Sequence, residues 1–272
     1  MSTITIVNGF SPLNRWLLYT SFMLAPAQFF SGLGNNCPSN FGFLAYNWYT
    51  QISWLHAIQN HELHALSLLP VHFNLLFVFT YLGGVTSGNL AMGIFLGLGT
   101  GGVIIVNTVA AWISWATNQP EGFGVYQFFF FGWRTLSPGW HKFILVWQIS
   151  DSLFALNCLY LAIYLPIKMS KYTKEEMDKI PWYLGKFPLI PVGAAGALLV
   201  GWPLILWTEL IVARNNIESD TDWVAVWLFI AQAGAMLMPG SATYFGCMKR
   251  AFKKPKSDGN FIVGSLNRGL AR

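Results

Sequence analysis

Three acidic residues lie in or beside long uncharged stretches of the chain, where acid chemistry would be shielded from water. Asp151 and Glu209 are each the single charged residue of a hydrophobic stretch, and Glu62 separates two such stretches. A carboxylate at the centre of a bilayer costs at least about 2.5 kcal/mol, so it is a functional hypothesis by default. We interpret Asp151, Glu209 and Glu62 as candidate catalytic acids or bases.

Two polar residues and two tryptophans are spaced to assist these acids. At 1.5 Å of rise per residue, Asp151, His72 and Asn107 lie about 13–15 Å deep from the same side. Trp147 is four residues before Asp151, on the same helical face, and Trp112 is another deep ring. Aromatic faces in a dry cavity stabilise a cation. We predict that His72, Asn107, Trp147 and Trp112 bind a substrate. The alternative is a buried polar cluster that holds helices together.

Two motifs suggest cofactor chemistry, and neither has the spacing or context it needs. His61-Glu-Leu-His64 lacks the i, i+4 spacing that places two histidine ligands on one helical face. Gly97-Leu-Gly-Thr-Gly-Gly102 matches a dinucleotide fingerprint in letters, but it lies within an uncharged helical stretch. Its glycines continue a small-residue stripe from Gly93, which is typical of close helix packing. We therefore predict no metal and no cofactor.

The elements that position these residues follow from composition. Only 10% of the 272 residues are charged and 54% are hydrophobic, whereas a soluble domain carries about 25% charged residues. Uncharged runs of this length are typical of a bilayer-spanning protein. The dispersed positive charge is not that of a nucleic-acid binder, so no nucleic-acid partner is expected.

The predicted fold is all-α, a polytopic transmembrane helix bundle of six to seven spans. Phe41–Ala57 suits either a seventh span or an interfacial helix, and Phe123–Thr135 is too short to cross. The six predicted spans are Arg15–Leu33, Leu63–Tyr81, Asn89–Ala116, His141–Ile167, Phe187–Ala213 and Trp223–Met248.

The distribution of lysine and arginine predicts the orientation. Seven basic residues follow position 248, which puts the C-terminus in the cytosol. The Lys168–Lys186 loop is also basic, and two spans separate it from the tail, so the two observations agree. Arg214–Asp222 and Thr117–Trp140 then face the lumen. We divide the chain into a transmembrane helical domain, 1–248, and a basic cytosolic tail, 249–272, in an integral protein of the endoplasmic reticulum.

Small size, several spans, intramembrane acids and aromatic density together resemble the fungal integral-membrane terpene cyclases of meroterpenoid pathways. The resemblance implies cyclisation of a prenyl or epoxy-prenyl chain, begun by a carboxylic acid in a span, with Asp151 and Glu209 in that role. The implied partners are a hydrophobic prenylated or epoxidised terpenoid and the lipid bilayer.

Two other classes of function fit the same residues. Asp151 and His72 suit the proton relay of a proton-coupled transporter or channel, with prolines marking interrupted helices. A non-catalytic multi-pass membrane protein is the third reading. A prenyl substrate assay separates the first class from the other two.

Overall fold

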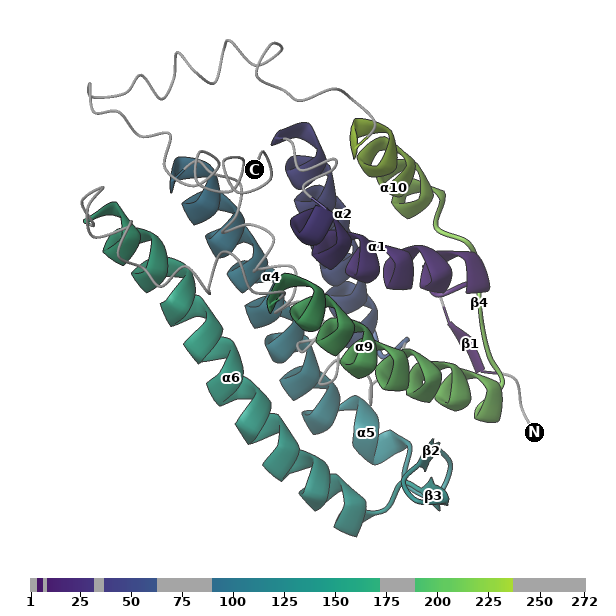
Figure 1. Cartoon of the computed structure of the whole chain (residues 1–272). Helices are drawn as coiled ribbons and strands as arrows, with labels where there is room; N and C mark the ends of the chain where they lie inside the picture. Colours follow the sequence, from purple (N-terminus) through teal and green to yellow (C-terminus); the bar gives the residue numbers. More distant parts are fainter. Residues whose placement is uncertain (1–3, 7–8, 32–36, 63–89, 172–188, 237–272) are drawn as a thin grey trace.

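The computed structural model describes residues 4–6, 9–31, 37–62, 90–171 and 189–236 (Figure 1). Most of these residues are helical, which confirms the predicted helical class. The helices are α1 (Pro12–Ser31), α2 (Cys37–Gln59), α4 (Leu90–Ala116), α5 (Asn118–Glu121), α6 (Pro138–Ser170), α9 (Leu189–Arg214) and α10 (Trp223–Met236). The predicted all-α class is incomplete, because the chain also forms strands β1 (Ile4–Ile6), β2 (Gln127–Phe129), β3 (Trp133–Thr135) and β4 (Ile217–Ser219).

Three helices begin at side chains that cap their first turn. Ser11 and Ser137 each precede a proline, the residue best suited to the first helical position. Ser11 Oγ accepts a hydrogen bond at 3.3 Å from the N–H three residues ahead, at the start of α1. Asp222 does the same for α10, with its Oδ1 accepting two backbone N–H groups at 2.9 and 3.3 Å. Capping of this kind determines where each helix starts.

Four helices pack side by side in the order α6, α4, α2, α10 (Figure 1). Trp112 on α4 donates a hydrogen bond to Ser152 on α6. Gly101, which is earlier on α4, faces Leu159, which is later on α6, so these two helices are antiparallel. Glycines on α4 face progressively later residues of α2, so α2 and α4 are parallel. The N-terminal half of α2 meets the C-terminal half of α10, so that pair is antiparallel. Helix α1 packs against α9 and α10.

Glycines on α4 permit its close approach to both neighbours. A Cβ atom at Gly102 would lie 2.5 Å from the Trp48 ring, and one at Gly99 would lie 2.5 Å from Leu44, both on α2. Gly101 faces Leu159 of α6 at 3.1 Å by the same measure. The predicted packing role of this glycine-rich segment therefore holds for two faces of α4.

Replacing Gly102 with leucine is expected to lower the amount of folded protein and its thermal stability in detergent. A side chain at this position must displace Trp48, and overpacking of a filled contact typically costs about 1–3 kcal/mol. Gly234→Leu on α10 is the matched control, because a Cβ there meets no atom within 4 Å. Equal stability of the two variants would contradict a tight α2–α4 contact.

The N-terminus and three loops meet at one end of the bundle, which we call the loop end (4–11, 58–62, 117–137 and 215–222). Strand β1 pairs in parallel with β4, and β2 pairs with β3 as a hairpin. Asn215 exchanges hydrogen bonds of 2.8 and 3.0 Å with Gln127, and Asn118 donates to the carbonyl of Ile58. The segment Phe123–Thr135 thus contains a short hairpin that closes this end.

Burial at the loop end affects the chemistry of one tyrosine. Gly122 lies so close to the Tyr126 ring that a Cβ at position 122 would overlap it. Burial, with the nearby Glu121 carboxylate, raises the pKa of the Tyr126 phenol well above its ordinary value. Tyr126 is therefore a neutral packing residue, and its side chain belongs to the closed loop end.

Within the described residues, two helices are long and apolar enough to span a membrane, at Gly97–Ala116 and Pro138–Tyr164. They overlap the predicted spans Asn89–Ala116 and His141–Ile167. The described helices in Arg15–Leu33 and Phe187–Ala213 do not meet the same criterion, so the described residues do not support six to seven spans. The described part of Trp223–Met248 is a shorter apolar helix, whereas Leu63–Tyr81 and the tail 249–272 lie outside the described residues. Large apolar side chains are exposed along α6: Phe143, Val146, Ile149, Leu153, Leu156, Tyr160 and Ile163.

Candidate functional site at the loop end

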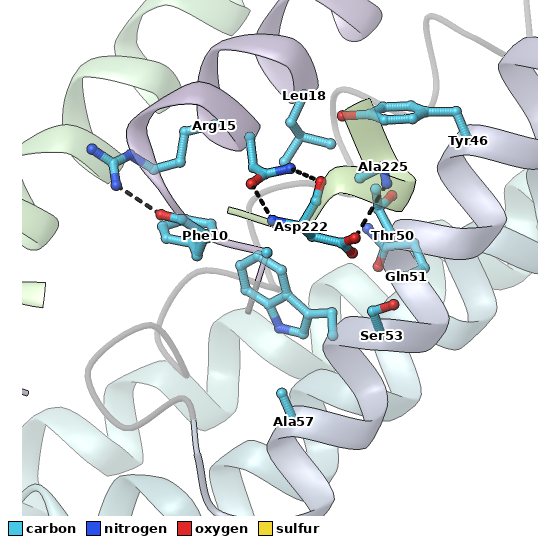
Figure 2. Close-up of a pocket in the computed structure, with 13 residues that line it drawn as sticks. Phe10, Arg15, Leu18, Tyr46, Thr50, Gln51, Ser53, Ala57, Asp222 and Ala225 are labelled. Carbon is cyan, nitrogen blue, oxygen red and sulfur yellow. Dashed lines mark hydrogen bonds between the residues drawn. The ribbon is translucent and has the colours of Figure 1, made fainter. Parts of the chain in front are cut away.

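A cavity of about 40 Å³ lies where α1, α2 and the start of α10 meet (Figure 2). Residues far apart in the sequence form its walls. They are Gly9, Phe10, Asn14, Arg15, Leu18, Tyr46, Thr50, Gln51, Ser53, Trp54, Ala57, Asp222 and Ala225. The cavity is large enough for ordered water or a small polar group of a ligand.

Asp222 is the acidic residue of the cavity wall. Its Oδ1 caps α10, and its Oδ2 accepts a hydrogen bond from the Tyr49 hydroxyl at 2.8 Å. Asn14 on α1 holds the Asp222 backbone from both sides, by donating to its carbonyl at 3.0 Å and accepting from its N–H at 2.9 Å. Three donors to one carboxylate hold the Asp222 side chain in a fixed orientation at the N-terminus of α10.

Arg15 lines the cavity and forms an ion pair directed away from it. Its Nε donates to Glu209 Oε1 at 2.8 Å and its NH2 donates to Oε2 at 3.1 Å, which is the bidentate arrangement. Its NH1 donates to the Phe10 carbonyl at 2.9 Å. The Tyr19 hydroxyl donates a third hydrogen bond to Glu209 at 2.7 Å. These contacts tie α1 to α9.

Aromatic rings form much of the remaining wall. Phe10 and Trp54 meet edge to face, with ring centroids 5.4 Å apart. Tyr46 is almost fully buried and packs edge to face against Phe229 of α10 at 5.7 Å. Such pairs add about 0.5–1.5 kcal/mol beyond the area they bury. The cavity therefore has rigid aromatic walls around a single uncompensated carboxylate.

Gln51 brings a buried amide to the same cavity from α2. Its side chain is 2% exposed, and its Oε1 makes no hydrogen bond with any described residue. In Figure 2 the Asp222 carboxylate points toward α2, which carries Gln51. A buried amide oxygen without a partner is rare in folded proteins, since it loses its hydration on folding.

Asp151 lies elsewhere, in the contact between α6 and α4. It is 7% exposed, and the neighbouring Gln148, Ala155 and Cys158 are buried on the same face. The antiparallel register puts Asn107 of α4 level with about Ala155, one helical turn from Asp151. The predicted polar layer also includes His72, which lies outside the described residues, so the layer stays a prediction. Helices α4 and α2 separate Asp151 from the cavity.

Of the two predicted tryptophans, Trp112 lies in the contact between α4 and α6 and Trp147 lies at the surface. Trp112 is half-buried and donates a hydrogen bond to Ser152 Oγ at 2.9 Å. Trp147 is 42% exposed, although the prediction placed it beside Asp151 on one face. At 100° per residue, Gln148 rather than Trp147 faces α4, and Trp147 turns outward.

Glu62 lies at the loop end, one turn beyond α2. Its backbone N–H donates to the carbonyl of Ala57, a cavity residue, at 2.9 Å. The adjacent His61 contacts Glu121 at 3.2 Å. His72 lies outside the described residues. Within those residues, no three His, Cys, Asp or Glu side chains are grouped so as to hold a metal ion.

Several residues of the cavity were not predicted as site residues from the sequence. Asp222 is preceded by a polar loop and followed by an apolar helix, which is the signal of a helix cap and not of a site. Arg15 and Asn14 lie at the start of α1, and Gln51 is a lone amide in an aromatic-rich helix. Their shared role depends on the packing of three helices.

Comparison with protein-family models, with curated proteins and with solved structures gives no match to this chain.

Proposed function

We propose that this chain is a multi-pass membrane enzyme that cyclises a prenyl or epoxy-prenyl chain by acid–base catalysis. The observation that carries the proposal is the wall of the cavity at the loop end, which combines one carboxylate, Asp222, with the rings of Phe10, Tyr46 and Trp54. A cavity of about 40 Å³ takes only the polar, reacting end of the substrate, and the rest of the prenyl chain extends outside it. Carbocation chemistry needs this combination. Ring faces and a fixed anion stabilise developing positive charge without water, which would otherwise trap the cation.

We assign the two acid–base roles to two of the carboxyl groups at the loop end, Glu62 and Asp222. Glu62, in its neutral form, donates a proton to the epoxide oxygen, and the carbon–oxygen bond breaks as an alkene attacks the carbon. Asp222, as the carboxylate, faces the resulting cation and finally accepts a proton from carbon. The product is an isomer of the substrate, and no oxidant, reductant or cofactor is consumed.

The proposal includes a bundle of seven spans. The parallel directions of α2 and α4 favour an odd number of crossings between them. We propose that the predicted span Leu63–Tyr81 is that crossing. With it, Phe41–Ala57 counts as a span, the N-terminus and the loop end are luminal, and the C-terminus is cytosolic in the endoplasmic reticulum.

The orientation is tested with single cysteines in sealed microsomes and an impermeant thiol reagent. One cysteine replaces Thr5 in β1 and another replaces Ser219 in β4, the two strands that pair at the loop end. Both are expected to label only after the membrane is opened. A cysteine at Ser257 in the tail is expected to label in intact microsomes. Labelling of position 219 from the cytosolic side would place the cavity on the wrong face and contradict the proposal.

The activity is tested by incubating membranes that contain the chain with prenylated-phenol epoxides. The expected result is a new product of unchanged mass, since cyclisation is an isomerisation. Membranes from cells without the chain are the control for spontaneous opening of the epoxide. Water opens an epoxide to a diol, whose mass is higher than that of the substrate. Absence of any isomer across phenol and indole substrates would contradict a cyclase.

A further inference from the structure

We infer that the cavity recognises an uncharged hydrogen-bond donor on its ligand, a hydroxyl or a ring N–H, through Gln51 Oε1 and the Asp222 carboxylate. The inference deepens the proposed function, on which it rests, by naming the chemical character of the substrate's polar group. It also identifies Gln51 as a residue that determines specificity and has no part in proton transfer.

The first step is that Gln51 needs a partner. Its Oε1 is an acceptor with two lone pairs, is buried, and makes no hydrogen bond with any described residue. Leaving such an acceptor unpaired is costly, so water or a ligand donor is expected to occupy it. The cavity beside it is large enough for either.

The second step is that Arg15, Tyr49 and Thr50, three strong donors at the cavity, are already engaged. Arg15 donates through three nitrogens to Glu209 and to Phe10. The Tyr49 hydroxyl donates to Asp222, and the Thr50 hydroxyl donates to the Asn47 carbonyl at 3.0 Å. The Tyr46 and Ser53 hydroxyls can donate or accept, whereas Gln51 Oε1 and the Asp222 carboxylate can only accept. The cavity wall therefore offers a ligand two acceptors, Gln51 Oε1 and the Asp222 carboxylate.

The third step concerns charge. Glu209 neutralises Arg15, so Asp222 supplies the net charge of the cavity wall, which is negative. A ligand carboxylate or phosphate is repelled there. A ligand ammonium arrives hydrated and would have to lose its water to enter, a cost that a carbocation formed inside the cavity does not carry. A neutral O–H or N–H avoids both costs.

The experiment measures binding of probes that cannot be cyclised, with the full chain in lipid nanodiscs. The probes are 4-decylphenol, its methyl ether 4-decylanisole, and 4-decylbenzoate. We expect the phenol to bind at least about tenfold more tightly than the ether, as loss of one buried hydrogen bond implies, and the benzoate to bind most weakly. A second pair, 3-decylindole and its N-methyl form, determines whether a ring N–H serves as well as a hydroxyl.

Variants separate recognition from partition into lipid. Gln51→Leu is expected to abolish the tenfold preference while retaining binding of the ether, and Gln51→Met serves the same purpose with an unbranched chain. Gln148→Leu is the control, because Gln148 is equally buried and its amide also lacks a partner among the described residues, yet it does not line the cavity. Its preference is expected to match the wild type.

Equal binding of phenol and ether by the wild type, binding of neither, or an unchanged preference in both Gln51 variants would overturn the inference. These outcomes are distinct from failure of the cyclase, since the decyl chain has no alkene or epoxide. A preference for the donor probe without any cyclisation would support the recognition site and contradict the cyclase activity. Cyclisation without a donor preference would support the cyclase activity and contradict the recognition site.

Discussion

Replacing Asp222 with asparagine is expected to reduce turnover of a prenyl epoxide by at least about a hundredfold, with near-normal amounts of folded protein. Asparagine caps helices as well as aspartate does, so it can keep the hydrogen bonds to the first turn of α10. Its amide also retains a contact with Tyr49. The variant loses the negative charge, and with it the final proton acceptor, which typically contributes about 10²–10⁴-fold to a rate.

The control for Asp222 is Asp220→Asn, because Asp220 is an exposed carboxylate two residues earlier in the same loop. Its turnover is expected to stay within about twofold of the wild type, a range set by the small effects of exposed charges. The measurement is product formed per amount of protein in matched membranes. Equal turnover of both variants would remove Asp222 from the mechanism.

The same assay separates the roles of the other acids. Glu62→Gln is expected to lose turnover to a similar extent, because glutamine cannot donate a proton to the epoxide oxygen. Asp151→Asn is expected to retain turnover, since it keeps hydrogen-bonding capacity within the α4–α6 contact. Asp151→Leu is expected to lower stability there instead, through polar groups left unpaired. A hundredfold loss of turnover in Asp151→Asn would return the acid role to Asp151.

Replacing Arg15 with methionine is expected to destabilise the protein by about 3 kcal/mol, the largest effect on stability among these changes. The substitution removes three hydrogen bonds and leaves the Glu209 carboxylate with Tyr19 alone. Breaking a buried ion pair from one side costs about 3–5 kcal/mol. The lower end applies because the Glu209 side chain is 34% exposed, against 9% for Arg15.

The ion-pair prediction is measured by thermal unfolding in detergent, with two comparison variants. Arg15→Met with Glu209→Met is expected to recover much of the loss, because replacing both partners removes the unpaired charge. Arg214→Met is the control for an exposed arginine, which donates to Gln127 and stacks on Trp133. A loss no greater than that of Arg214→Met would show that the Arg15–Glu209 pair does not hold α1 on α9.

Local patterns predicted the helices well and the strands not at all. The uncharged stretches favour helices, because water is absent from a bilayer or a dry core. Backbone N–H and C=O groups there form hydrogen bonds within their own helix. The segments around Gly101 and Leu153 accordingly form the two helices able to span a membrane. The hairpin 127–135 and the β1–β4 pair depend on contacts between segments up to about 200 residues apart, and three residues of strand have no local signal.

For the site, composition alone identified the acids that lie within uncharged stretches, because the absence of charge nearby along the chain can be read from the residues. It did not identify their surroundings: Glu209 is paired with Arg15, and Asn107 lies one turn from the level of Asp151. The set of side chains that share a cavity depends on how the helices pack. Depth says nothing about lateral position, so Asp151 and Glu209 separated into different helix contacts, and Asp222, Gln51 and Trp54 met because α1, α2 and α10 are neighbours.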